Sequence, residues 1–191
     1  MPRIVDHHER REQITQLARA LLLKEGLGAL TVRNIAKQLG FSTAVVSHYF
    51  TSKQDLMLLI YLDAHGRAEK RFLQAQKDYS DPAKVLSVFL PIEATSQQNW
   101  QIWFALWSMT ALDETFRHQQ ALQARRLLKQ ITATLGAHPA MAGQRDKMTI
   151  ARNVFALMSG IATQAMLDPD SWSPQRQRKQ LRQGIERLIG P

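Results

Sequence analysis

The chain of 191 residues contains no cysteine, which excludes disulfide bonds, thiolate nucleophiles and zinc sites built on cysteine. This absence is compatible with a reducing compartment, and we expect a cytoplasmic protein. Glycine and proline are scarce, at 9 and 7 residues, whereas apolar residues make up 45%. The composition therefore predicts a globular protein with a substantial core rather than a disordered chain.

Long apolar runs are also missing, and the runs that exist are broken by polar residues, so none predicts a membrane span. The charged N-terminus is not followed by an apolar segment, and we expect no secretory signal there. The sequence has no glycine-rich phosphate loop, no His-Glu-x-x-His and no Gly-x-Ser-x-Gly motif. Two scattered histidines, His65 and His118, have no evident catalytic partner. We therefore expect no enzymatic activity, no cofactor and no metal site.

Helical periodicity runs through nearly the whole sequence, and no strand-like alternation stands out. Start and stop signals divide this pattern, among them Gly26, Asp81-Pro82, Asp168-Pro169 and Ser173-Pro174. Pro91 is expected to kink or divide the segment in which it lies. The pattern predicts an all-α fold of about nine helices.

The segment 30–50 has the features of two short helices that cross through a tight turn. Thr31 is expected to cap the first helix, and Gly40 supplies a turn residue that tolerates positive φ. The small side chain of Ala36 suits the point where the helices touch, and Val46 packs the second helix onto the first. The second helix is expected to begin at Ser42 or Thr43. A plain helical hairpin would also satisfy these few positions.

The outward positions of the second helix are short or polar: Thr43, Ala44, Ser47 and His48. Such a face suits a helix that lies in a DNA major groove about 12 Å wide. A net charge of +9 agrees with a polyanionic partner, although charge alone does not separate nucleic acid from an anionic membrane. A non-specific nucleic-acid or membrane-surface protein is therefore the alternative, but the basic residues are not dense on one face.

The stretch from Arg10 to about Ile60 resembles the tetracycline-repressor (TetR) family of bacterial regulators. The resemblance rests on Leu30-Thr-Val-Arg-Asn-Ile-Ala, on Gly40-Phe-Ser and on His48-Tyr-Phe-Thr-Ser-Lys-Gln-Asp-Leu56. It implies a helix-turn-helix DNA-binding domain over 1–54 with three helices, followed by a helical ligand-binding and dimerisation domain over 55–191.

The resemblance also implies roles for individual residues. Tyr49 and Lys53 would contact phosphates, Thr43, Ala44 and His48 would face base edges, and Arg33 would reach the groove. Ser47 stands where many relatives have tyrosine, so one common phosphate contact is weakened or replaced. Independently of the family, an N-cap at Thr31 directs backbone N–H groups toward a possible phosphate, and Lys53 adds a charge-assisted contact.

The segment Trp103-Phe-Ala-Leu-Trp107 with Arg125-Arg-Leu-Leu128 resembles the branch of the family typified by the repressor of choline-to-betaine synthesis, BetI. Trp103 and Trp107 are i, i+4 neighbours, and together with Phe104 they are candidate ligand-binding residues. Indoles at this spacing suit a quaternary ammonium through cation–π attraction. Ordinary core packing of these rings is the alternative.

Two apolar stripes near the C-terminus are candidates for a dimer interface. One lies within Met148–Met166 and the other comprises Leu181, Ile185, Leu188 and Ile189. By the resemblance these helices pair with their copies in a four-helix bundle, and the alternative is that each chain buries them in its own core. We expect a homodimeric repressor that a small molecule releases from a palindromic operator.

Overall fold

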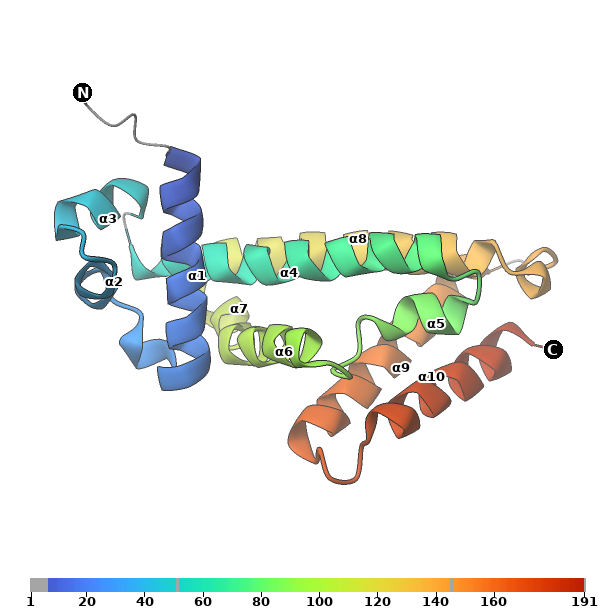
Figure 1. The fold of residues 1–191 in the computed structure, drawn as a ribbon. Coiled ribbons are helices and arrows are strands. Elements are labelled where there is room, and N and C mark those ends of the chain that lie inside the picture. The colour runs from blue at the N-terminus through green and yellow to red at the C-terminus, as the bar shows by residue number, and fades with distance from the viewer. Residues whose placement is uncertain (1–6, 51, 145, 191) are drawn as a thin grey trace.

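The computed structural model describes residues 7–50, 52–144 and 146–190, and these residues form an all-helical fold without strands (Figure 1). The all-α prediction is thus confirmed. The α-helices are α1 (His7–Glu25), α2 (Val32–Leu39), α3 (Thr43–Tyr49), α4 (Lys53–Asp78), α5 (Pro82–Ser87), α6 (Ala94–Trp107), α7 (Met109–Leu112), α8 (Glu114–Gly136), α9 (Lys147–Leu167) and α10 (Pro174–Ile189). Short 3-10 helices follow α1 at Leu27–Ala29 and α8 at Pro139–Met141.

The helix starts that the sequence predicts at Thr31, Ser42, Asp81 and Ser173 are present in the structure. A side-chain oxygen of each N-cap accepts a backbone N–H of the first turn, which satisfies one donor that the helix leaves free. These caps are Thr31, Ser42, Ser52, Asp81, Asp113 and Ser173. Pro91 divides its segment as expected, because α5 ends at Ser87 and α6 begins at Ala94.

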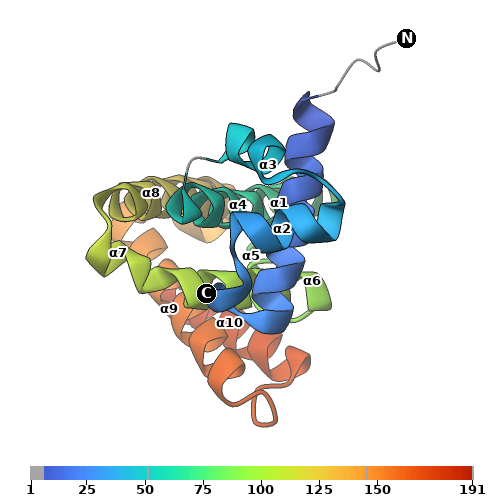
Figure 2. The same ribbon diagram turned by 90° about the vertical axis from the view of Figure 1, so that its left-hand side faces the viewer.

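Helices α1 to α3 form a small head at one end of the molecule, next to the start of α4 (Figures 1 and 2). Ile35, Val46 and Phe50 are buried there, and the guanidinium of Arg10 lies 5.3 Å from the centre of the Phe41 ring. The predicted boundary between residues 54 and 55 falls in the first turn of α4. One continuous helix therefore joins the head to the remaining helices, which we call the body.

The body is built mainly from α4, α6, α8, α9 and α10. Helix α1 packs against both α4 and α6, so the head contacts the body through more than its covalent connection (Figure 1). None of the helices in the described ranges is long and apolar enough to cross a membrane.

The last two helices pack closely against each other and against α5 and α8. Gly184 permits the close approach, because a Cβ placed there would lie 2.2 Å from Cδ2 of Leu157. The stripe residues that the sequence offers for dimerisation, such as Val154, Leu181 and Ile185, are buried within the single chain. These residues therefore belong to the core of the single chain, and the homodimer stays a prediction.

Candidate DNA interface and effector cavity

The turn between α2 and α3 has the geometry that the sequence predicts. Gly40 adopts φ +67°, in the left-handed region that favours glycine. The N–H of Phe41 donates to the carbonyl of Ala36 at 2.9 Å, and the N–H of Gly40 donates to that of Lys37 at 3.4 Å. This pair of bonds is a Schellman motif, which ends α2 and turns the chain into α3.

Helix α3 presents its predicted outer face to solvent. Thr43, Ala44, Ser47 and His48 are all exposed, whereas Val46 on the opposite side is 1% exposed and packs into the head. Ser42 caps the helix, since its hydroxyl accepts the N–H of Val45 at 3.3 Å. The structure thus places the four outward positions that the sequence names together on one short and accessible helix.

Residues with phosphate-binding chemistry flank this face. Lys53 is exposed at the first position of α4, and Arg33 is exposed on α2. The hydroxyl of Thr31 accepts the N–H of Asn34 at 3.1 Å, so it caps α2 as expected. Tyr49 is half-buried at the last position of α3.

A histidine that the sequence does not single out lies against the end of α3. Nδ1 of His7, the first residue of α1, is 2.8 Å from the Tyr49 hydroxyl. The His48 ring packs edge-on against Tyr49, with ring centroids 5.3 Å apart. The orientation of Tyr49 therefore depends on α1 as well as on α3.

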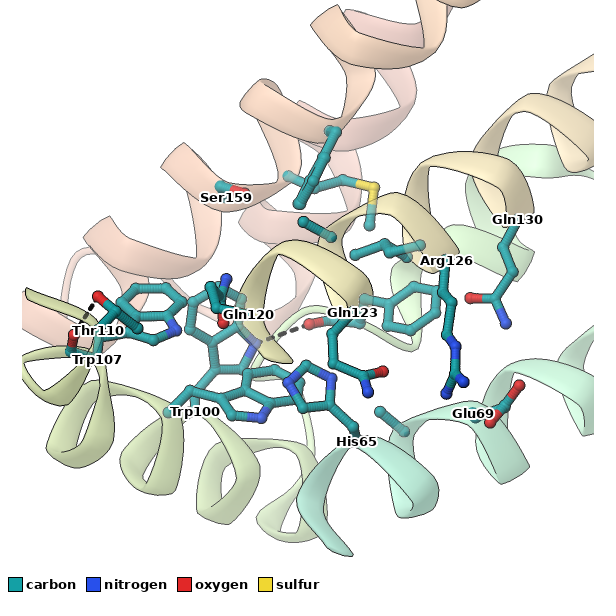
Figure 3. A pocket seen from close by; sticks show the side chains of 17 residues that line it. His65, Glu69, Trp100, Trp107, Thr110, Gln120, Gln123, Arg126, Gln130 and Ser159 are labelled. Atoms are coloured by element: carbon teal, nitrogen blue, oxygen red, sulfur yellow. Dashed lines mark hydrogen bonds between the residues drawn. The ribbon is translucent and has the colours of Figure 1, made fainter. Parts of the chain in front are cut away.

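A cavity of about 500 Å³ lies in the body between α4, α6, α8 and α9 (Figure 3). This volume falls in the range of about 300–1,000 Å³ that is typical of small-molecule sites. Its walls combine aromatic and aliphatic side chains with several neutral amides and hydroxyls. The lining residues are His65, Ala68, Glu69, Phe89, Trp100, Trp103, Trp107, Thr110, Gln120, Gln123, Ala124, Arg126, Leu127, Gln130, Phe155, Met158 and Ser159.

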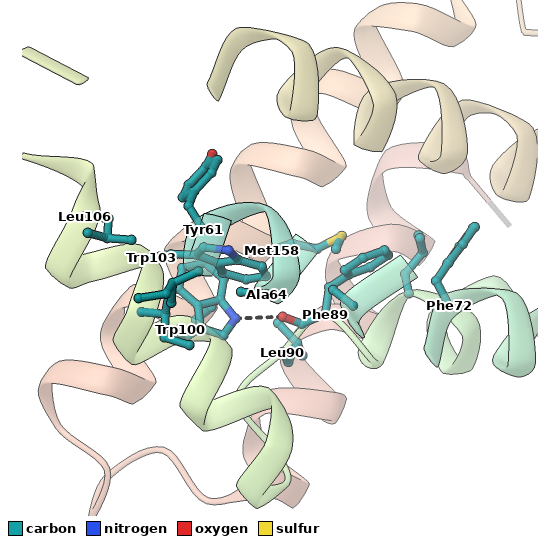
Figure 4. Packing of buried hydrophobic residues seen from close by; sticks show 14 of the residues in the cluster. Tyr61, Ala64, Phe72, Phe89, Leu90, Trp100, Trp103, Leu106 and Met158 are labelled. Atoms are coloured by element: carbon teal, nitrogen blue, oxygen red, sulfur yellow. Dashed lines mark hydrogen bonds between the residues drawn. The ribbon is translucent and has the colours of Figure 1, made fainter. Parts of the chain in front are cut away.

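The tryptophans of α6 serve both the core and the cavity wall. Trp103 is 7% exposed, yet it lines the cavity with Trp100 and Trp107. The Trp100 indole N–H donates to the carbonyl of Phe89 at 2.8 Å, which fixes this ring (Figure 4). Phe104 is not a lining residue: its ring packs edge-on against Trp100 and Trp107, so it supports the wall from behind.

His65, which had no evident partner in the sequence, forms part of the cavity wall. Its ring packs against Trp103, and the edge of Tyr61 lies 4.6 Å away between centroids. Burial lowers the pKa of His65 to about 4, and the positive charge of Arg126 acts in the same direction. The imidazole is therefore neutral at pH 7. Within the described ranges its Nε2 has no hydrogen-bond partner.

The polar groups of the cavity come mainly from α8. The hydroxyl of Tyr61 donates to Oε1 of Gln120, and burial raises the Tyr61 pKa above its usual value. At the end away from Trp107, the side chains of Glu69 and Arg126 come from facing helices, and both residues are exposed (Figure 3). The charged groups thus lie at the outer end, while the aromatic end is uncharged.

Two family models match the chain. Residues 14–60, which include α2 and α3, match the family model described as bacterial regulatory proteins of the tetR family. Residues 83–190, more than half of the chain, match the model of the C-terminal domain of BetI-type transcriptional repressors.

Curated relatives are similar over most of the chain. The transcriptional regulator PksA of Bacillus subtilis (strain 168) is 26% identical, covering 98% of this chain and 94% of its own length. The regulator BetI of Serratia proteamaculans (strain 568) is 27% identical, with coverage of 84% and 83%.

Solved structures share the fold. A putative transcriptional regulator from Saccharomonospora viridis, crystallised in complex with choline, superposes with a TM-score of 0.81. It is 22% identical, and the match covers 94% of this chain and 97% of that one. A transcriptional regulator from Rhodococcus sp. Rha1 gives a TM-score of 0.80 at 19% identity, with coverage of 93% and 95%.

Proposed function

The chain belongs to the TetR family of bacterial regulators, within its BetI-type group, and from this membership we propose that it is a ligand-responsive repressor. In this proposal a homodimer binds a palindromic operator in the cytoplasm, and a small molecule in the body cavity releases it. The observation that carries the proposal is the exposed face of α3, held on a buried Val46 and flanked by cationic side chains.

DNA contacts follow from the arrangement of the head. Helix α3 would enter the major groove with Thr43, Ala44 and His48 toward the bases. Tyr49 and Lys53 would contact phosphates, and Ser47 would stand at the place of a phosphate contact common in relatives. Arg33 is the side chain best suited to a bidentate guanine contact, and the N-terminus of α2 at Thr31 would receive a further phosphate. Because few of these side chains are strong base readers, shape and backbone contacts would carry much of the affinity.

Dimerisation supplies the geometry for a two-fold operator. Two recognition helices must lie about 34–36 Å apart to read successive major grooves. Since the apolar stripes of α9 and α10 are buried in the single chain, the partner would meet their outward faces. On α9 this face includes Ala156 and Gly160, which are exposed and small enough for close helix approach.

The cavity is the proposed effector site. Indole faces of Trp103 and Trp107 would attract a quaternary ammonium, and the neutral state of His65 would avoid repulsion of that cation. The choline complex of the Saccharomonospora viridis regulator agrees with such a ligand in a related fold. The volume of about 500 Å³ also leaves room for substituents larger than those of choline.

Selection of bound DNA from a random pool tests the proposal. We expect a palindrome with half-sites about one helical turn apart, and choline should reduce the fraction of operator retained in a gel shift. A protein that coats nucleic acid without preference would enrich no sequence, which would overturn the specific-regulator assignment. Tighter binding in the presence of choline would reverse the assigned sign of regulation.

A further inference from the structure

A polar cluster of four side chains joins the head to the body beside the cavity. Nη1 of Arg19, on α1, donates to Oδ2 of Asp63, on α4, at 3.2 Å. Nη1 of Arg67, one turn further along α4, donates to the same oxygen. Nε and Nη2 of Arg67 then donate to Oδ1 of Asn99, on α6, at 3.3 and 2.9 Å. The cluster therefore connects α1, α4 and α6.

One end of the cluster touches the cavity wall. Asn99 is fully buried, and its Nδ2 donates to the carbonyl of Ala64 at 3.0 Å. Asn99 directly precedes Trp100, and Ala64 directly precedes His65, and both of these neighbours line the cavity. Both partners of the bond between Asn99 and Ala64 are therefore directly adjacent in sequence to cavity-lining rings.

The other end of the cluster lies on the helix that supports the recognition helix. Arg19 shares α1 with His7, whose Nδ1 is 2.8 Å from the Tyr49 hydroxyl at the end of α3. His7 and Arg19 lie twelve positions apart on one unbroken helix, a rise of about 18 Å. Helix α1 also packs directly against α4 and α6. A shift of α1 would therefore change the position of α3 even if α4 did not bend.

The charges in the cluster are unequal, because one carboxylate oxygen serves two guanidinium groups. Burial lowers the pKa of Arg67 to about 10, with further contributions from Arg19 and Arg71, so Arg67 stays charged at pH 7. Asn99 satisfies donors of Arg67 that would otherwise compete for Asp63. If Asn99 withdraws, Arg67 can take more of the Asp63 carboxylate and weaken its bond to Arg19.

We propose that Asp63 is the positioning residue through which occupancy of the cavity sets the placement of α1 and hence of α3. The inference rests on the proposed function and names the side chains that carry its regulation. The defining observation is that Oδ2 of Asp63 is shared between a head arginine and an arginine tied to the cavity wall. Two arrangements of this shared bond would bias the operator-binding geometry.

The first test measures coupling in the full-length chain. The operator dissociation constant is measured with and without saturating choline, and the ratio cancels whatever a variant does to operator binding alone. Couplings of about 5- to 150-fold are typical for the wild type. The ratio should fall below about twofold, a near loss of that coupling, for Asp63→Asn and Arg19→Gln, and it should recover for Arg19→Lys. Arg117→Gln removes an exposed ion pair on α8 and serves as the matched control. An undiminished ratio for Asp63→Asn overturns the proposal.

A second test requires no ligand. Asn99→Ala should change operator affinity in the wild-type background. It should leave operator affinity unchanged in the Arg19→Gln background, because the bond between Arg19 and Asp63 is already missing there. Additive effects in this cycle overturn the proposal even if choline does not bind. Binding of choline to the wild type is measured by tryptophan fluorescence. If choline does not bind, only the assigned effector class is contradicted. Failure of the wild type to select any operator would contradict the regulator itself and is seen before any variant is made.

Discussion

The imidazole of His65 packs against the indole of Trp103, with ring centroids 4.9 Å apart and 32° between the ring planes. The pair brings α4 and α6 together at the cavity. Because the imidazole is enclosed, its proton-binding state affects both folding and the ligand site.

Stability should fall as the pH decreases from about 6.5 toward 4. His65 has its pKa lowered to about 4, so between these values the unfolded chain binds a proton that the folded chain does not. The contribution of neutral His65 to the free energy of unfolding is complete above the pKa of histidine in the unfolded chain. As the pH falls this contribution is lost, by on the order of 2 kcal/mol at pH 5. Urea unfolding of the wild type and of His65→Gln measures the difference, and parallel pH profiles would contradict it.

Trp107 and Phe104 should differ in their effect on the effector site. Trp107→Ala removes a ring that lines the cavity, so choline affinity should fall by about 2- to 30-fold, which corresponds to cation–π attraction of about 0.5–2 kcal/mol. Phe104→Ala is the matched control, since its ring lies behind the wall, and less than a roughly twofold change is expected. Equal losses in calorimetric titration would show that packing, rather than the ring face, determines affinity.

Lys53 should affect the salt dependence of operator binding. Each phosphate contact contributes about 0.9 to the slope of log K against log salt, so Lys53→Gln should reduce the slope by about 1.8 in a dimer. Lys129→Gln, an exposed lysine on α8, should leave the slope unchanged. Fluorescence anisotropy over a range of salt concentrations gives both slopes, and an unchanged slope for Lys53→Gln would remove this residue from the DNA interface.

Gly40 and Gly66 should respond to alanine in opposite directions. Gly40 has φ +67°, where a Cβ costs about 1–2 kcal/mol, so Gly40→Ala should destabilise the head. Gly66 lies inside α4, and a Cβ there meets nothing within 4 Å, so Gly66→Ala should stabilise by about 0.5–1 kcal/mol. Urea unfolding followed by circular dichroism checks both signs. Destabilisation by both substitutions would mean that the helix-interior site is more crowded than it appears.

The sequence predicts local features well because their causes are local. Caps such as Thr31 and Ser173 act within their own first turn, and the Gly40 turn involves residues within five positions. The buried position of Val46 likewise follows from the packing of one short helix on the other.

Features that depend on distant partners are absent from the sequence pattern. Arg19 and Asp63 are 44 positions apart, and Arg67 and Asn99 are 32 apart, so no short window contains the cluster. The sequence likewise does not predict that His65 and Gln123 line a cavity. A polar side chain on a helix gives the same sequence pattern whether it faces a cavity or water. Periodicity predicts that a stripe is buried, but not against which surface.

The burial of the α9 and α10 stripes within one chain has a consequence for how an assembly would form. Each subunit can bury its own core before it associates. Dimerisation would therefore join two folded subunits and would not be needed to complete the core of either one. The midpoint of thermal unfolding should then stay constant at protein concentrations below the dimer dissociation constant, where folded monomers unfold, and rise only above it. Subunits tagged differently should exchange between dimers without passing through an unfolded state.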